Sequence, residues 1–199
     1  MRFALAVLAI VSFAANAHAE AHDGLYLRGQ VGLGWASAST ELADTAETDL
    51  SFKGGAGYLN LEVGGAIKAP LIIFGKLYHL RAPDPKLEVG TLSFDTNIDA
   101  YISGIGGGAT YYFMPSNFYL TGAISFGIMG AKDNRGNDFD TDVGLMTHLG
   151  FGIEFLTGPN FGLGVGAELA LGFFTDEIAT DDLFWGAGYG LITLNATYN

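Results

Sequence analysis

Two histidines are the side chains in the central sequence best suited to acid–base chemistry. His79 and His148 are the only histidines that follow residue 22. A histidine beside a serine such as Ser103, or beside an acid, is the arrangement that activates a hydroxyl nucleophile. The Gly-x-Ser-x-Gly motif of many hydrolases is absent from the sequence, and no other local motif indicates a nucleophile. We therefore predict a protein that is not an enzyme, with no catalytic residues, and keep a lipid-modifying enzyme as an alternative.

Three aspartates at alternate positions form the best candidate for metal binding. Asp138, Asp140 and Asp142 carry hard oxygen ligands of the type that calcium prefers. However, Val143 stands where an EF-hand loop has its glycine, and no glutamate closes the loop at the required spacing. We therefore predict solvated loop acids and no metal or cofactor, with a weak divalent-ion bridge to lipopolysaccharide phosphates as the alternative. The chain has no cysteine, which excludes disulfides and thiolate metal ligands.

Four charged residues interrupt segments that otherwise consist of apolar and small residues. They are Arg28, Glu62, Lys76 and Glu168. Charges removed from water must be paired, because leaving one partner alone costs roughly 3–5 kcal/mol. We therefore predict that these side chains point into the interior of the protein, at similar heights along the strands, and form an ion-paired cluster. Such a cluster either closes a water path or only satisfies its own members.

Alternation of apolar and polar residues defines the elements that must position these charges. In residues 25–35 and 161–173, large apolar side chains fall at every second position, which is the period of a β-strand. The same period is clear in four further segments, whereas residues 71–80 and 98–113 alternate less cleanly. No internal stretch has the roughly 18 uninterrupted apolar residues that a membrane helix needs. The pattern therefore predicts an all-β protein.

Three turns that contain proline divide the chain at nearly equal intervals. They hold Pro70, Pro115 and Pro159. Four acidic segments alternate with these turns: residues 41–49, 81–95, 132–142 and 176–182. Short turns at one end and long polar loops at the other are typical of outer-membrane barrels, and four loops with three turns imply eight strands.

The size of the side chains predicts which strand face points outward. The interior of an eight-stranded barrel is only just wide enough for side chains to fill. Several leucines, valines or phenylalanines from most strands would overfill it, whereas the opposite faces carry glycine, alanine, serine and threonine. Those faces also carry the charges, and an arginine or lysine in the middle of the lipid costs about 2–4 kcal/mol. We therefore predict an eight-stranded antiparallel up-and-down transmembrane barrel with its large apolar residues toward lipid.

Aromatic residues near the predicted strand ends indicate girdles at the two membrane interfaces. The predicted girdle residues are Tyr26, Trp35, Tyr58, Tyr111, Tyr112, Phe113, Phe155, Phe161, Phe173, Trp185 and Tyr198. Ordinary sheet propensity of aromatic residues is the other explanation for this pattern.

The N-terminus predicts export. Arg2, the short apolar run 3–13 and the Ala17-His18-Ala19 motif are typical of a cleaved signal peptide. We therefore predict a signal peptide over residues 1–19 and a barrel domain over residues 20–199. The formal net charge is −12, which argues against nucleic acid or an anionic surface as a partner of a basic patch.

The sequence resembles the outer-membrane protein A-like superfamily of small eight-stranded barrels. The resemblance rests on Gly24-Leu25-Tyr26-Leu27-Arg28-Gly29-Gln30-Val31-Gly32-Leu33-Gly34, on Thr110-Tyr111-Tyr112-Phe113 and on the closing alternating strand. It implies a bacterial outer-membrane location and a closing aromatic that the outer-membrane assembly machinery reads. Here Tyr198 is the penultimate residue and Asn199 the last, a departure from that pattern.

Together these observations predict a non-enzymatic protein of the outer membrane. Its expected role is structural or interaction-based, through acidic extracellular loops. Its expected partners are outer-membrane lipid, lipopolysaccharide and the assembly machinery, and not nucleic acid. A narrow porin-like channel for small or apolar solutes is the alternative, and a lipid-modifying enzyme is a further one.

Overall fold

The structure is a computed structural model that describes residues 24–41, 49–68, 70–133, 135, 137–178 and 181–198. The predicted signal peptide, residues 1–19, and most of the first acidic segment lie outside the described residues. Within the described ranges, no helix is long and apolar enough to span a membrane.

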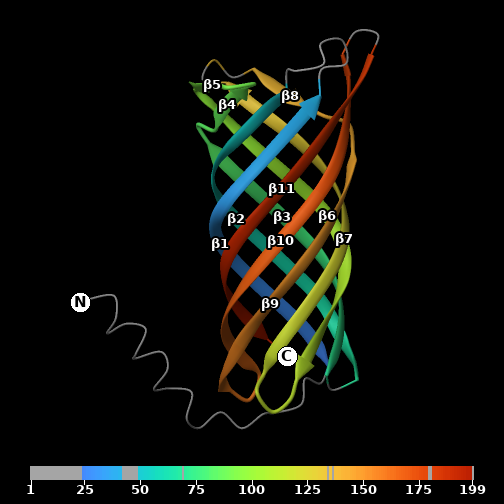
Figure 1. The fold of residues 1–199 in the computed structure, drawn as a ribbon. Coiled ribbons are helices and arrows are strands. Elements are labelled where there is room, and N and C mark those ends of the chain that lie inside the picture. The colour runs from blue at the N-terminus through green and yellow to red at the C-terminus, as the bar shows by residue number, and fades with distance from the viewer. Residues whose placement is uncertain are drawn as a thin grey trace, which may run out of the picture.

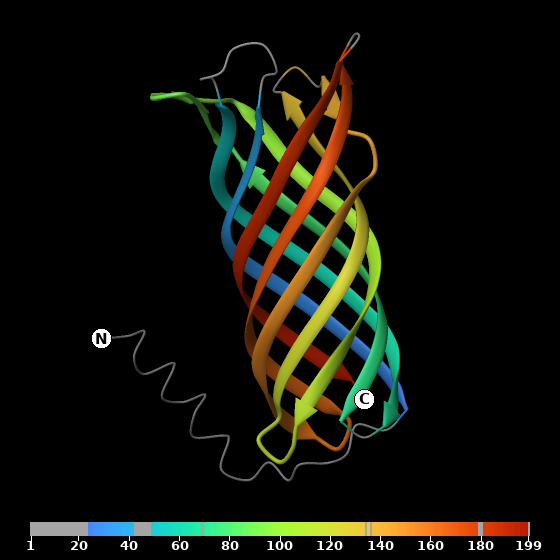
Figure 2. The same cartoon turned by 45° about the vertical axis from the view of Figure 1, so that its right-hand side comes forward.

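Eight long strands form one closed antiparallel barrel (Figures 1 and 2). They are β1 (Leu25–Glu41), β2 (Asp49–Lys68), β3 (Leu71–Pro83), β6 (Ile98–Phe113), β7 (Phe118–Asp133), β9 (Gly144–Gly158), β10 (Phe161–Ile178) and β11 (Asp181–Tyr198). Each pairs with its neighbours in the chain, and β1 pairs with both β2 and β11, which closes the barrel. The predicted eight-stranded up-and-down barrel is confirmed.

The β2–β3, β6–β7 and β9–β10 connections are short and lie at the end of the barrel where β11 finishes (Figure 1). The β3–β6 and β7–β9 connections at the other end are longer, whereas only residues 179 and 180 separate β10 from β11 there. We call the two ends the turn end and the loop end. The β6–β7 turn contains a cis Met114–Pro115 bond and a left-handed residue, Asn117, with a φ of 51°. Asparagine tolerates that conformation better than most residues. The three proline turns all lie at the turn end, as predicted.

Strand faces follow the predicted alternation. Large apolar side chains cover the outer surface, and Leu33, Leu171 and Phe173 are 75%, 71% and 74% exposed. Charged and polar side chains of the opposite faces, among them Arg28 and Glu62, are buried in the interior. The strand β3, which alternates less cleanly in sequence, also alternates fully between buried and exposed residues. The predicted inside-out arrangement is confirmed.

Several aromatic residues lie where the sequence did not predict them. Tyr26, Tyr58 and Tyr112 point into the interior, and Trp185 packs against the buried interior layer, so the prediction that these four belong to interfacial girdles is wrong. The interior also holds further aromatic side chains, those of Phe74, Tyr78, Tyr119, Phe174 and Tyr189. The physical reason is that inward-facing glycines make room for large rings. A Cβ added at Gly152 or Gly166 would lie 2.5 Å from the hydroxyl of Tyr119.

Strand pairing also extends further toward the loop end than predicted. The third predicted strand continues to Pro83, and the acidic segment 81–95 contains a hairpin, β4 (Lys86–Val89) and β5 (Leu92–Asp95), that pairs with β2. The segment 132–142 contains β8 (Asp138–Asp140), which pairs with β7. The segment 176–182 lies largely within β10 and β11, whose pairing reaches Ile178 and Asp181. Main-chain hydrogen bonds do not depend on side-chain polarity, so acidic residues extend the strands here.

Candidate functional site

Arg28 is the centre of the first polar group in the barrel interior. Its side chain on β1 is fully buried, with Nη1 3.6 Å from Glu62 of β2 and Nη2 3.3 Å from Glu154 of β9. The guanidinium also hydrogen-bonds to Tyr112 and lies 4.4 Å from the ring centroid of Tyr119. Two carboxylates and the faces of aromatic rings therefore surround one buried cation. We call Arg28, Glu62, Glu154, Tyr112 and Tyr119 the Arg28 cluster.

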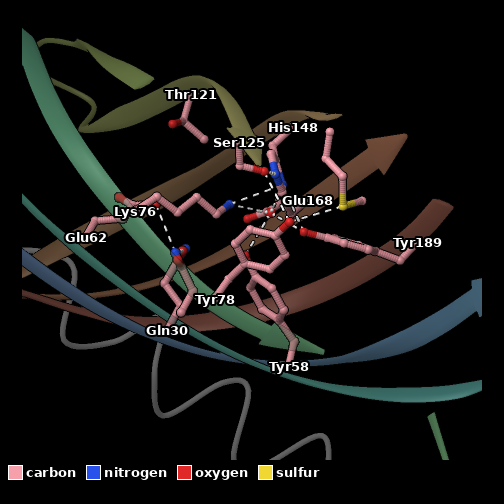
Figure 3. A network of polar contacts seen from close by, with 12 residues as sticks. Gln30, Tyr58, Glu62, Lys76, Tyr78, Thr121, Ser125, His148, Glu168 and Tyr189 are labelled. Atoms are coloured by element: carbon pink, nitrogen blue, oxygen red, sulfur yellow. Dashed lines mark hydrogen bonds and ion pairs between the residues drawn. The ribbon is translucent and has the colours of Figure 1, made fainter. Parts of the chain in front are cut away.

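Glu168 is the centre of the second group (Figure 3). Its Oε1 atom lies 2.6 Å from the Nζ of Lys76 and accepts hydrogen bonds from the hydroxyls of Tyr58, at 2.9 Å, and Tyr189, at 3.0 Å. The same oxygen lies 3.1 Å from Nδ1 of His148. The adjacent strands β2 and β3 and, across the barrel, the adjacent strands β9, β10 and β11 supply these side chains. We call Lys76, Glu168, His148, Tyr58 and Tyr189 the Glu168 cluster.

The four charged residues singled out in the sequence therefore all lie in the interior. The structure pairs Arg28 with Glu62 and Lys76 with Glu168, while register places Glu62 of β2 opposite both Arg28 and Lys76. Their predicted role in closing a water path stays a prediction. Sequence reasoning did not include Glu154, His148 and the tyrosines in the cluster. Their position on the glycine-bearing face of each strand was the signal that could have found them.

Ser125, His148 and Glu168 share the connectivity of a catalytic triad. The Oγ of Ser125 lies 2.7 Å from Nε2 of His148, whose Nδ1 faces Glu168. A serine, a histidine base and an orienting acid are the groups that nucleophilic catalysis requires. However, Ser125 is 0% exposed and His148 is 2% exposed, so a substrate carbonyl cannot reach the hydroxyl in this arrangement. The three side chains act here as mutually satisfied buried polar groups.

The serine that the sequence suggested as a partner for a histidine lies elsewhere. Ser103 hydrogen-bonds to His79 at 2.8 Å on the exposed outer face of β3 and β6, and the ring of Tyr101 stacks on that of His79. Asp99, on the same face, binds Arg81 at 2.7 Å. Thus His79 pairs with Ser103, whereas His148 pairs with Ser125 on the inside of the barrel.

The aspartates of segment 132–142 do not share one described site. Asp140 accepts a hydrogen bond from the hydroxyl of Tyr101. Among the described residues, no group of three histidine, cysteine, aspartate or glutamate side chains is placed to hold a metal ion. The side chain of Asp138 lies outside the description, and the contact of Asp138, Asp140 and Asp142 with a divalent ion stays a prediction.

Known structures share this fold, although neither a family model nor a curated protein matches the chain. No protein-family model matches the chain. No curated protein matches it in sequence either. Neisserial surface protein A superimposes with a TM-score of 0.55 at 17% identity, over 90% of this chain and 99% of that one.

Two further outer-membrane proteins have a similar fold. OprG from Pseudomonas aeruginosa gives a TM-score of 0.50 at 12% identity, covering 92% of this chain and 99% of that one. The outer membrane protein AlkL gives 0.53 at 10% identity, covering 90% and 92%. This chain thus has the fold of the small outer-membrane β-barrels, as its sequence predicted.

Proposed function

We propose that this protein is an integral outer-membrane barrel with a closed interior, which serves as a non-enzymatic scaffold rather than as an open channel. The observation that carries the proposal is the pair of ion-paired clusters across the barrel. Arg28, Glu62, Lys76, Glu154 and Glu168 are each no more than 4% exposed. The apolar outer surface supports a place in lipid, because exposed apolar patches of that extent are rare in soluble monomers.

Energetics support the closed state. In the proposed closed state, a permeating ion would have to separate Lys76 from Glu168 or Arg28 from its carboxylates. Separating such a buried pair leaves charges without partners, which costs roughly 3–5 kcal/mol. Glu168 would also lose hydrogen bonds from two tyrosines. The closed arrangement is therefore strongly favoured over one with a water path.

Conductance of the refolded protein in planar bilayers tests the proposal. We expect no stable single-channel steps from the natural sequence. The double variant Lys76→Ala with Glu168→Ala removes both charges together, so we expect a measurable rise in conductance. Leu163→Ala, a comparable truncation on the outer face, is the matched control. A large stable step from the natural protein would refute the proposal, and a silent double variant would mean that another group closes the interior.

The loop end supports the interaction part of the proposed role. The β4–β5 hairpin projects sideways from the barrel at this end (Figure 2). Leu92 on the hairpin and Phe139 on β8 are 61% and 67% exposed, and exposed apolar side chains are common where proteins meet partners or lipid. We propose that this end, with its acidic residues, meets lipopolysaccharide or an extracellular partner.

The two alternatives make distinct predictions. A narrow channel for small or apolar solutes predicts swelling of proteoliposomes in such solutes. A lipid-modifying enzyme would draw on the exposed His79–Ser103 pair, and it predicts altered lipid species when the protein is overproduced.

A further inference from the structure

An apolar cavity of about 330 Å³ opens at the loop end of the barrel. Its walls include Phe52 of β2, Ile98 of β6, Met129 of β7 and Trp185 of β11. Ligand pockets typically begin at about 300 Å³, so the cavity has the size of a small-molecule site. Residues from both ends of the chain build it, because β1 and β11 are neighbours in the barrel.

The cavity has a closed floor. Its wall residues Met129 and Trp185 pack against a buried apolar layer that includes Leu80, Ile102 and Phe174. Tyrosines of the Glu168 cluster belong to the same layer. A molecule that enters from the loop end therefore meets first an apolar layer and then a paired polar cluster.

A smaller space of about 40 Å³ extends the cavity toward β2 and β3. It shares Ala38, Phe52 and Met129 with the larger one and is bounded by Leu80 on its inner side. Because the walls carry mostly hydrocarbon groups, burial of an apolar ligand in the cavity is favourable.

The charged residues at the cavity indicate whether its ligand is a cation or an anion. Two of its lining residues, Asp133 and Asp140, are charged, and both are acidic. The side chain of Asp133 lies on the inner face, opposite Ile98, whereas the carboxylate of Asp140 accepts a hydrogen bond from Tyr101 on the outer face. The whole chain carries a formal net charge of −12, which repels anions over a longer range. The rings of Phe52 and Trp185 lie 6.0 Å apart in the wall, and aromatic faces attract cations.

We propose that this cavity binds a compact apolar cation, a hydrophobic amine whose hydrocarbon body fills the pocket and whose ammonium group faces Asp133. Main-chain hydrogen bonds from Arg135 and Asn137 hold that carboxylate in place. The inference builds on the proposed closed interior, which makes the cavity a blind binding site rather than the entrance of a channel. A dry apolar cavity of about 150 Å³ holds benzene. The cavity of this protein has about twice that volume and therefore suits a larger hydrocarbon group than benzene.

The test uses a tryptophan inside the cavity wall. The chain has two tryptophans, and Trp35→Phe removes the one on the outer surface, so Trp185 becomes the only tryptophan and can be excited selectively over the tyrosines. The protein is placed in vesicles of zwitterionic phosphatidylcholine and titrated with three probes that share one hydrocarbon body: 1-adamantylammonium, 1-adamantanol and 1-adamantanecarboxylate. We expect a saturable change in Trp185 emission with the ammonium ion, and at least about tenfold weaker responses with the other two, a difference of about 1.4 kcal/mol.

Two variants separate shape from charge. Ala38→Phe fills the cavity and should abolish the saturable change, whereas Ala196→Phe, on the outer face of β11, should leave it intact. Asp133→Asn keeps an oxygen that can accept the main-chain hydrogen bonds from Arg135 and Asn137 but removes the charge. We expect it to weaken binding of the ammonium ion about fivefold and to leave binding of the alcohol unchanged.

Three results would overturn the inference. They are a linear response that is equal for all three probes, a saturable response that Ala38→Phe does not alter, and a preference for the carboxylate. The titration does not depend on conductance. If the interior is open but the site exists, the protein conducts and the titration saturates. If the interior is closed but the cavity binds nothing, the protein does not conduct and the titration does not saturate. Failure of one proposal can thus be told from failure of the other.

Discussion

The carboxylates and aromatic rings around Arg28 all interact favourably with its positive charge. Carboxylates of Glu62 and Glu154 flank the guanidinium, and the rings of Tyr26, Tyr112 and Tyr119 lie within 6 Å of it. One cation thus balances two acids that come from strands on different sides of β1. Removal of the cation leaves both acids buried, so the stability of the barrel should be sensitive to this one side chain.

The variant Arg28→Met tests that sensitivity. It keeps much of the side-chain length but leaves two carboxylates without a cation, and we expect the free energy of unfolding in lipid to fall by about 3–5 kcal/mol. Urea titration followed by the shift in electrophoretic mobility measures it. Adding Glu62→Gln and Glu154→Gln to Arg28→Met should restore much of the loss. Unchanged stability of the single variant would mean that water already solvates the acids.

Glu88, at the loop end, is expected to make the stability of the fold depend on pH. The hydrogen bond from Lys53, whose Nζ lies 2.5 Å from the carboxylate, lowers the pKa of Glu88 below its usual value of 4.5. Because the pKa is lower in the folded state, the pair stabilises the fold above the unfolded pKa and loses its effect as the pH falls through the lowered value. Carboxylate NMR should record the lowered pKa, and Lys53→Met should raise it. Equal values in both proteins would contradict the pairing.

At the scale of the strands, glycine and tyrosine on the inner faces are complementary. Tyr78 has its hydroxyl close to Gly104 and Gly127, where an added Cβ would lie 2.5 Å and 2.9 Å from it. The same relation holds between Tyr119 and two glycines of β9 and β10. The glycines thus shape the spaces that the rings occupy, and the interior is packed by pairs of very large and very small residues.

Gly152→Ala tests this complementarity. An added Cβ at Gly152 would lie 2.5 Å from both the Tyr119 hydroxyl and the carbonyl oxygen of Val165, so we expect a loss of about 1–3 kcal/mol in unfolding free energy from overpacking. Gly57→Ala is the control, since nothing lies within 4 Å of its added Cβ. Equal losses in the two variants would attribute the effect to the backbone rather than to crowding.

The strands and their faces could be predicted because their signals are local. The alternation from Leu25 to Trp35 identifies both the strand and its lipid-facing side, and the three prolines identify the turns. The same alternation places Tyr26 on the inner face, opposite Leu25, whereas its position near a strand end predicts an interfacial girdle. The contacts of the inward tyrosines could not be predicted, because they depend on glycines of other strands. Pairing partners such as Arg28 and Glu154 depend on the stagger of the closed barrel, which no single segment encodes.

At the scale of the whole molecule, the two ends of the barrel differ. Short turns lie at one end, and the hairpin of β4 and β5 and the apolar cavity lie at the other. The proposed outer-membrane orientation places the loop end outside the cell.

Single cysteines test this orientation, since the chain has none of its own. Thr91→Cys lies between β4 and β5, and Asn160→Cys lies in the turn between β9 and β10; both positions are exposed. A membrane-impermeant maleimide should label Thr91→Cys on intact cells and Asn160→Cys only after lysis. Labelling in the reverse order would mean that the barrel is inserted upside down.

The pairing of β1 with β11 has a consequence for how the polypeptide matures. The seam joins the first described strand to the last, with Leu27 opposite Tyr198, so no earlier fragment has both of its edges satisfied. Until β11 has been added, the large apolar side chains on the outer faces of the earlier strands do not yet belong to a closed barrel. The unclosed intermediate must therefore be protected from aggregation. Deletion of part of β11 is expected to destabilise the whole barrel and not that strand alone.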